Sequence, residues 1–211
     1  MAKNIFVKLL DTNDKISKDI NAAIAEEVNK RIRKNRRKAR ITLRNLVPQW
    51  IREQPEMVSL SAEGVDSLAA QVGLPFGTGP RAADAIAAAV RGSLIIDFNT
   101  VNTGLKGLIE FSIQPTDFVN LLNLPNGVVY TELGAALPWL EWLLLRGNTV
   151  IVGGYSYEPA PDGRSGGGFM QFGGSWRIPP QFAGFPDNNF ITRALENRND
   201  QIEEILKGLI A

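Results

Sequence analysis

Isoleucine or valine recurs at every fourth position near the start of the chain, at Ile16, Ile20, Ile24, Val28 and Ile32. Residues four apart lie on the same side of an α-helix, so this spacing predicts an amphipathic helix from about 14 to at least 38, capped at 13–14. The apolar pattern resumes at 43–51. Pro48 is expected to bend or restart the helix there, because it lacks a backbone donor.

The middle of the chain alternates between helical and strand-like patterns. A helix is expected from Ser61 to Gly73, and an alanine-rich helix over 82–90, stopped by Gly92. Runs rich in strand-forming residues at 93–99 and 107–113 predict an antiparallel hairpin. A short helix at 115–124 follows, and then a buried helix over 132–146, which Pro138 can restrict to its second half.

The stretch from 147 to 195 combines a strand, a long loop, a glycine-rich strand and the start of the last helix. The strand covers 149–152, the loop 155–168 and the second strand 166–173, and the last helix is expected from about 187 to 209, capped by Asp187 or Asn188. Two strand-like runs separated by Pro, Asp and Gly are typical of a hairpin with an extended tip. We expect this tip to reach outward.

These elements predict an α+β fold. We expect a long N-terminal helix, an antiparallel sheet of about four strands with helices packed on one face, and a closing C-terminal helix. The predicted organisation is a basic helical arm over 1–60 and an α+β core domain over 61–211 with a protruding loop at 155–168.

Charge is distributed unevenly along the chain. Residues 1–60 hold fourteen Lys/Arg and seven Asp/Glu, a net charge of +7, whereas 61–211 hold nine and fifteen, a net charge of −6. The cations crowd into 30–44, and no acid lies between Glu27 and Glu53. In a self-assembling protein the basic part of one copy can meet the acidic part of the next, and nucleic-acid contact by helix 30–44 is the alternative.

The residue types needed for common enzyme chemistry are largely missing. The chain has no cysteine and no histidine, which removes thiol nucleophiles and the commonest metal ligand and general base. Ser165 fits a Gly-x-Ser-x-Gly pattern, but it lies in a glycine-rich loop and has no histidine partner. Asp97 and Glu110 alternate with apolar neighbours and are expected on the solvent face of their strands. The remaining candidate carboxylates are Asp117, Glu132 and Glu141. We therefore expect no enzyme activity, no cofactor and no metal.

Aromatic residues gather in the second hairpin and in the loop after it. Tyr155, Tyr157, Phe169 and Phe172 lie among glycines, and Trp176 and Phe185 follow. Some must face the core, and the rest expose apolar surface of the kind that marks protein interfaces. The candidate interface residues are these six together with Arg36, Arg37 and Lys38. No apolar run is long enough to span a bilayer and no signal peptide is evident, so we expect a protein made and used in the cytoplasm.

The order of these features resembles the neck and tail-completion proteins of long-tailed bacteriophages. The likeness rests on the charged N-terminal helix, the strand after Gly147–Asn148, the Phe169-Met-Gln strand and Ile178-Pro-Pro followed by Asn189-Phe-Ile-Thr-Arg-Ala-Leu195. It covers roughly 90–210 and the N-terminal helix in outline. The resemblance implies a virion structural protein without catalytic residues. Such a protein forms a homo-oligomeric ring, typically six- or twelve-fold, that joins the head connector to the tail and surrounds the DNA channel. Its expected partners are copies of itself, other neck, adaptor or tail proteins, and DNA passing through the lumen without sequence reading.

Overall fold

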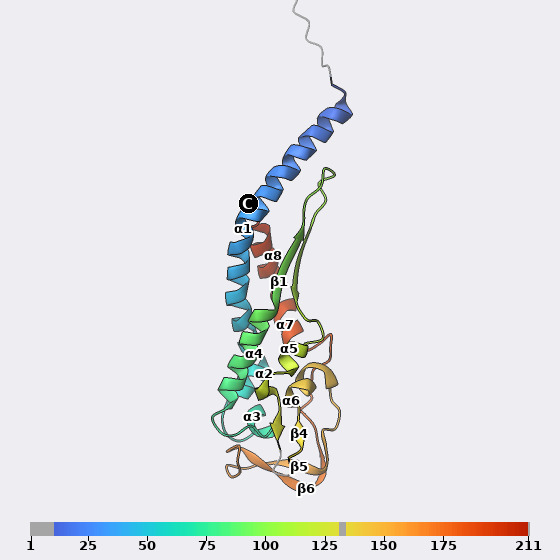
Figure 1. Cartoon of the computed structure of the whole chain (residues 1–211). Helices are drawn as coiled ribbons and strands as arrows, with labels where there is room; N and C mark the ends of the chain where they lie inside the picture. Colours follow the sequence, from blue (N-terminus) through green and yellow to red (C-terminus); the bar gives the residue numbers. More distant parts are fainter. Residues whose placement is uncertain (1–10, 131–133, 211) are drawn as a thin grey trace, which may run out of the picture.

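The computed structural model describes residues 11–130 and 134–210 and shows an elongated α+β protein (Figure 1). The helical elements are α1 (Asn13–Arg52), α2 (Pro55–Ser61), α3 (Leu68–Gln71), α4 (Gly79–Ser93), α5 (Val119–Leu122), η1 (Pro125–Gly127), α6 (Trp139–Glu141), η2 (Trp142–Arg146), α7 (Phe190–Glu196) and α8 (Asn199–Lys207). The strands are β1 (Leu94–Asn99), β2 (Leu108–Ile113), β3 (Val129–Tyr130), β4 (Ala136–Leu137), β5 (Val152–Pro159) and β6 (Gly168–Trp176). The predicted α+β class is therefore confirmed.

Helix α1 is a single helix of 40 residues that passes through Pro48 without a break. The expected restart at Pro48 is wrong, because the neighbouring residues Val47 and Ile51 are fully buried and hold the next turn in place. The N-terminal cap is Thr12, one residue earlier than expected, and its side chain accepts a hydrogen bond from the Lys15 amide. The predicted helix is thus confirmed and extended at its C-terminal end.

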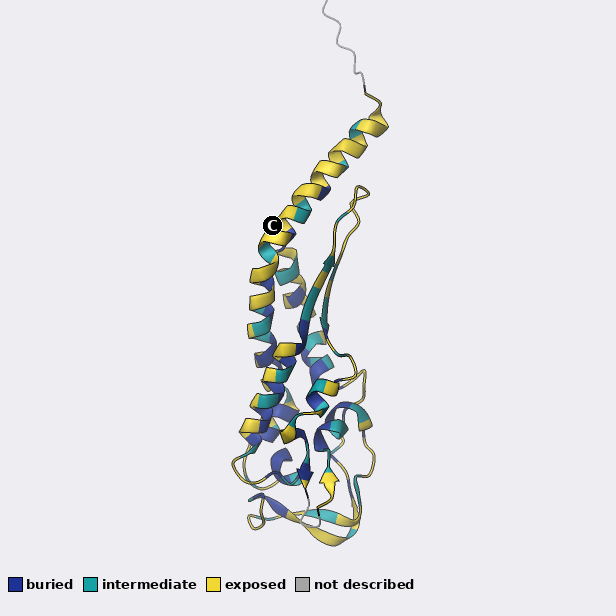
Figure 2. Cartoon of the chain, in the orientation of Figure 1, coloured by how far each residue is buried: buried dark blue, intermediate teal, exposed yellow. Residues whose placement is uncertain are grey.

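The core lies around the C-terminal half of α1. Leu43, Val47 and Ile51 of α1 are completely buried and belong to one cluster with residues of α2, α3, α4, α6, η2 and α7. Figure 2 shows this division, with the buried residues gathered around the lower half of α1 and the upper half largely exposed. The C-terminal part of the predicted arm over 1–60 is therefore part of the main core, and residues 1–10 of that arm lie outside the described residues.

The strands within the described ranges form three separate two-stranded antiparallel sheets, in place of the expected sheet of about four strands. The first hairpin is as predicted. Strands β1 and β2 pair in one continuous register, which runs from Leu94 opposite Ile113 to Asn99 opposite Leu108. The second hairpin, β5–β6, lies across the opposite end of the molecule (Figure 1). Alternation of apolar and polar residues shows which face of a strand is buried but not which strand lies at its edge, so the pattern could not separate these hairpins.

Several helix boundaries differ from those expected. The helix predicted to start at Ser61 is α3, which starts after Ser67, because the Ser67 hydroxyl accepts a hydrogen bond from the Ala70 amide. Its predicted end near Gly73 is close to the observed one. Pro138 restricts the predicted helix 132–146 to its second half, as α6 and η2. The first residues of that prediction, 132 and 133, lie outside the described residues.

The C-terminal helix is divided into α7 and α8 by a turn at 197–198. The cap of α7 is Asn189, in place of the expected Asp187 or Asn188. Its side chain accepts from the amides of Ile191 and Thr192, and the Thr192 hydroxyl accepts from the Asn189 amide, which completes a reciprocal capping box. Asn189 is fully buried, so this cap also fixes the chain against the core.

The β1–β2 hairpin packs against α1 and α8 through one face. Phe98, Val101 and Ile109 of the hairpin contact a small apolar cluster around Ile32 and Leu209. The Asn29 side chain forms two hydrogen bonds to the backbone of Val101, donating to its carbonyl oxygen at 2.9 Å and accepting from its amide at 2.8 Å. Because Asn29 satisfies both backbone groups, the hairpin tip is held against the middle of α1.

A buried ion pair joins α2 to α7. The Glu56 side chain is almost completely buried, and one of its carboxylate oxygens accepts from the Arg193 guanidinium. The other oxygen has no hydrogen-bond partner. Burial raises the pKa of Glu56, and the attraction of Arg193 only partly opposes this effect. The pair therefore holds two helices together around a carboxylate that depends on its cation.

We expect Arg193→Leu to lower the free energy of unfolding by about 3 kcal/mol at pH 7, because it leaves a buried carboxylate unpaired. The folded state holds the proton of Glu56 more tightly than the unfolded chain does. Loss of Arg193 raises the folded-state pKa of Glu56 further, so the deficit is complete above the pKa that Glu56 has in the variant and shrinks as pH falls from there towards its pKa in the wild type. Urea unfolding at pH 7 and pH 5 measures both effects, with Glu56→Leu/Arg193→Leu as the control that loses the pH dependence. A deficit that is the same at both pH values contradicts this role of Glu56.

Candidate interaction surfaces

Hairpin β5–β6 carries a row of large side chains on one face. In its register Tyr155 pairs with Phe172 and Tyr157 with Met170, and directly paired residues project from the same face of an antiparallel ribbon. The rings of Tyr155 and Phe172 meet edge to face with their centroids 5.8 Å apart. We call these four residues the aromatic face.

Most of the aromatic face is exposed. Phe172 is 85% exposed, and Tyr155 and Met170 are also exposed. Tyr157 is half-buried, and its hydroxyl donates to the Gly167 carbonyl oxygen at 2.7 Å. Phe169 projects from the opposite face and is 49% exposed. Apolar side chains therefore meet solvent on both faces of this ribbon.

The loop that joins β5 to β6 folds back onto the chain and does not protrude. Ser165, Gly167 and Gly168 are buried, and the Phe76 amide donates to the Arg164 carbonyl oxygen. A Cβ atom at Gly167 would overlap the Gly64 carbonyl and the Ala70 side chain, so only glycine permits this close approach. The predicted loop over 155–168 is in part strand β5 and in part this docked turn. Local turn residues indicated the loop but not the surface of 64–76 that holds it.

The other predicted aromatic candidates occupy different places. Trp176 is buried in the main core at the end of β6. Phe185 is 49% exposed and lies against Gly147, and its backbone exchanges hydrogen bonds with Asn188. Trp176 is therefore a core residue, whereas Tyr155, Phe169, Phe172 and Phe185 present accessible rings.

The outer side of α1 is densely basic. Six of its cations are exposed and a seventh, Arg44, is half-buried with its Nε enclosed: Lys30, Arg33, Lys34, Arg37, Lys38, Arg40 and Arg44. Among the ion pairs found in the described parts of the chain, none includes any of these seven residues. We call them the basic face. Of the other two cations in 30–44, the predicted candidate Arg36 lies 5.8 Å from the ring centroid of Phe98, and Arg31 pairs with Glu27.

The N-terminal half of α1 exposes part of the isoleucine row. Ile20 and Ile24 are 53% and 44% exposed, whereas Ile32 is buried. Each step of four residues turns about 40° around the helix axis, because an α-helix has 3.6 residues per turn. The row that begins on the buried side at Ile32 therefore rotates outward towards the N-terminus. Regular spacing predicted the helix, but it could not show that the row leaves the protein surface that covers it.

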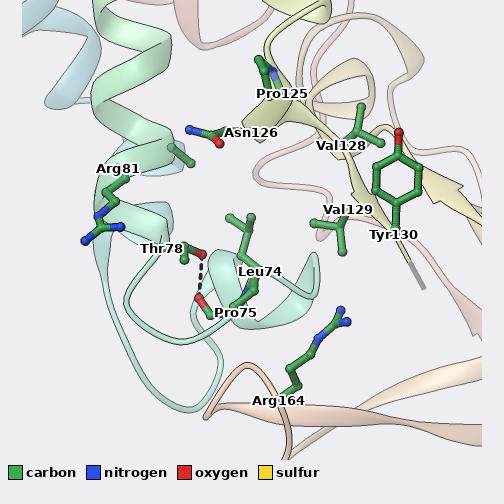
Figure 3. A pocket seen from close by; sticks show the side chains of 11 residues that line it. Leu74, Pro75, Thr78, Arg81, Pro125, Asn126, Val128, Val129, Tyr130 and Arg164 are labelled. Atoms are coloured by element: carbon green, nitrogen blue, oxygen red, sulfur yellow. Dashed lines mark hydrogen bonds between the residues drawn. The ribbon is translucent and has the colours of Figure 1, made fainter. Parts of the chain in front are cut away.

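A groove of about 380 Å³ lies between the start of α4, the segment 125–130 and the β5–β6 turn (Figure 3). Leu74 and Val129 line it, and Arg81 and Arg164 lie on either side. Arg164 donates to the Gly73 carbonyl oxygen at 3.1 Å, and the Thr78 hydroxyl donates to that of Pro75 at 2.6 Å. No carboxylate is among the lining residues, so the described groove offers no acid or base pair.

The candidate chemical groups do not come together in the described structure. The Ser165 hydroxyl is buried and donates to the Gly168 carbonyl oxygen at 3.2 Å, between two strands and not at a strand-to-helix elbow. Asp97 and Glu110 are exposed, as expected for the solvent face of their strands. Glu141 pairs with Arg146 and Asp117 accepts from the Val119 amide, while Glu132 lies outside the described residues. No group of three acidic side chains that could hold a metal is found in 11–130 and 134–210.

Comparison with family models, with curated proteins and with solved structures found no match for this chain. No helix among the described residues is long and apolar enough to cross a lipid bilayer. The resemblance to phage neck proteins therefore stays a prediction from the sequence.

Substituting alanine at Gly167 tests whether the β5–β6 turn is docked as the structure shows it. We expect Gly167→Ala to lower the free energy of unfolding by about 1–3 kcal/mol, because the added methyl group is forced against Gly64 and Ala70. Gly153→Ala on the same hairpin is the matched control, since open space surrounds that position. Chemical denaturation of both variants gives the comparison. Equal stability of the two variants would mean that the turn is not held against 64–76.

Proposed function

We propose that this protein is a virion structural protein of a tailed phage neck, which forms a homo-oligomeric ring between the head connector and the tail. The observation that carries the proposal is the exposure of large apolar side chains on both faces of β5–β6, above all Phe172. Apolar patches of this kind mark surfaces that bind other proteins. The sequence resemblance over roughly 90–210, with the N-terminal helix in outline, supports the neck as the place of assembly.

The rigidity of this ribbon also favours an interface. Its two ends are fixed, by Trp176 in the core and by the docked turn at 163–168, while the aromatic face between them is open. A fixed surface loses little conformational entropy when it binds, so exposed rings on it are suited to a permanent contact. In the proposed ring this surface engages a neighbouring subunit or the adjacent layer of the neck, and the ring surrounds the DNA channel.

The elongated shape and the charge distribution are consistent with a ring. Cyclic assemblies use two different surfaces of each subunit, so that each copy binds the next in the same way. The chain offers a basic face on α1 and a larger acidic part after residue 60. In this proposal the protein is assembled in the host cytoplasm and functions in the virion, as a six- or twelve-fold ring.

Phe172→Ser tests the aromatic face. We expect assembly to weaken at least tenfold, because the most exposed ring of the patch is removed, while stability changes by no more than about 1 kcal/mol from the lost contact with Tyr155. Mass photometry and negative-stain imaging of the purified chain measure the particles. Val58→Ser is the control, since Val58 is also exposed but lies on α2. A wild-type chain that stays monomeric at high concentration and with neck proteins contradicts the proposed function.

Nucleic-acid binding through α1 is the second candidate function, because none of the seven cations of the basic face forms an ion pair within the described residues. Their segment of α1 spans roughly 21 Å at 1.5 Å per residue. A continuous row of cations of this length can contact several phosphates of one duplex. It carries no base-reading pattern, so binding by this face would be independent of sequence.

Neutralising part of the basic face tests this candidate. If it is correct, Arg33→Ala/Arg37→Ala/Arg44→Ala weakens duplex DNA binding and flattens the dependence of log affinity on log salt by roughly 0.9 per lost phosphate contact. The control Arg81→Ala/Lys106→Ala/Arg177→Ala removes the same charge elsewhere on the exposed surface. Fluorescence anisotropy over a salt series gives the slopes. Identical slopes for the two variants would exclude α1 as the DNA contact.

A further inference from the structure

The outer face of the β1–β2 hairpin carries two carboxylates, Asp97 and Glu110, that form no ion pair within residues 11–130 and 134–210. Asp97 and Glu110 are direct cross-strand partners and both are exposed. Like charges placed opposite each other destabilise a strand pair. No ion pair found among the described residues includes either of them, and the nearby Arg36 is stacked on Phe98, which belongs to the other face of the hairpin.

One exposed apolar residue on this face and a second in the adjoining turn lie towards the tip. Leu108 lies two residues beyond Glu110 towards the tip, where it pairs with Asn99. Its side chain is 54% exposed, and that of Leu105 in the turn is also exposed. Strands rise about 3.3 Å per residue, so Leu108 lies roughly 7 Å beyond Glu110, and Leu105 lies further out in the turn. The outer face therefore has an apolar end at the tip and an acidic part nearer the core. We call it the hairpin outer face.

The exposed side of α1 has the complementary order. Ile20 and Ile24 are exposed near its N-terminus, and the exposed Lys34 and Lys38 follow fourteen residues later, a distance of roughly 21 Å. Ile20 and Lys38 are eighteen residues apart, which is five whole turns, so they face the same direction. Between the two pairs, Glu27 and Arg31 neutralise each other at 3.0 Å. We call this surface the α1 stripe.

The two surfaces lie on opposite sides of one molecule. Ile32 faces the hairpin, and at 100° per residue Lys34 and Lys38 lie roughly 200–240° around the helix from it. Both surfaces run in the same direction along the long axis, because the hairpin tip points towards the N-terminal end of α1 (Figure 1). In a ring of identical subunits, one surface of each copy binds a different surface of the next copy. Two surfaces on opposite sides of the molecule that run in the same direction can form such a contact. In a two-fold dimer, by contrast, a surface pairs with itself.

We propose that the hairpin outer face of one copy binds the α1 stripe of the next copy in the ring. Leu105 and Leu108 then cover the neighbour's Ile20 and Ile24, and Asp97 and Glu110 meet its Lys34 and Lys38. The occupant is a second copy because each surface supplies the charge and the apolar area that the other lacks, in the same order along the long axis. This inference rests on the proposed ring and names one of its subunit contacts.

Charge reversal on each side tests the contact. Asp97→Lys/Glu110→Lys and Lys34→Glu/Lys38→Glu are each expected to weaken self-association at least tenfold, and the two reversals combined are expected to restore it. All four side chains are exposed, so thermal unfolding of the monomer should be unchanged. Arg33→Glu/Arg40→Glu is the matched control, because it reverses two exposed charges on the same helix that lie 100° or more from Lys34 around the axis. Sedimentation velocity of the full chain at two salt concentrations measures each variant.

The outcomes separate this contact from the ring itself. If rings still form in both charge-reversal variants, or if the control variant disrupts assembly as much as Lys34→Glu/Lys38→Glu does, the proposed contact is wrong. The ring proposal is unaffected by either result. Loss of DNA binding with intact self-association in Lys34→Glu/Lys38→Glu also overturns it, because the stripe then binds nucleic acid. A wild-type chain that never assembles overturns the contact and the proposed function together.

Discussion

The structure depends on one helix that is buried along only half of its length. The C-terminal half of α1 supplies Leu43, Val47 and Ile51 to the core, and α4 and α7 pack against it. Burial of each such side chain stabilises the fold by about 1.5–3 kcal/mol. Among the described residues, the N-terminal half is covered only by the hairpin near Asn29 and, at Ile32, by the C-terminal residues around Leu209. Because an α-helix is stiff, the buried half determines the direction in which the exposed half projects.

The two long hairpins solve the same stability problem in different ways. A two-stranded ribbon is marginal in water, so each needs support from the rest of the chain. Hairpin β1–β2 buries one face on α1 and α8 and leaves the other free. Hairpin β5–β6 is fixed at its ends, through Trp176 and through the glycine turn against 64–76, and exposes side chains on both faces. Each mode of support leaves a defined surface open to a partner.

The polar groups follow the same division between core and surface. Inside, the buried Glu56 is paired with Arg193, and Asn189 satisfies the first turn of α7. Outside, the basic face of α1 and the carboxylates of the hairpin outer face form no ion pairs among the described residues. Unpaired surface charge of opposite sign on two sides of one molecule favours contacts between copies, and steers their encounter.

The sequence by itself determined the elements whose signals are local: the four-residue spacing of α1, the alternation of β1 and β2, and the exposure of Asp97 and Glu110. It also located the aromatic residues of β5–β6, and it showed that the chain contains no histidine and no cysteine. Only the tertiary structure decided that the strands form three separate sheets, that Trp176 is buried while Phe172 is open, and that the turn at 163–168 is docked. The physical reason is that periodicity records which side of an element is apolar, whereas the surface that covers that side is supplied by residues distant in the chain.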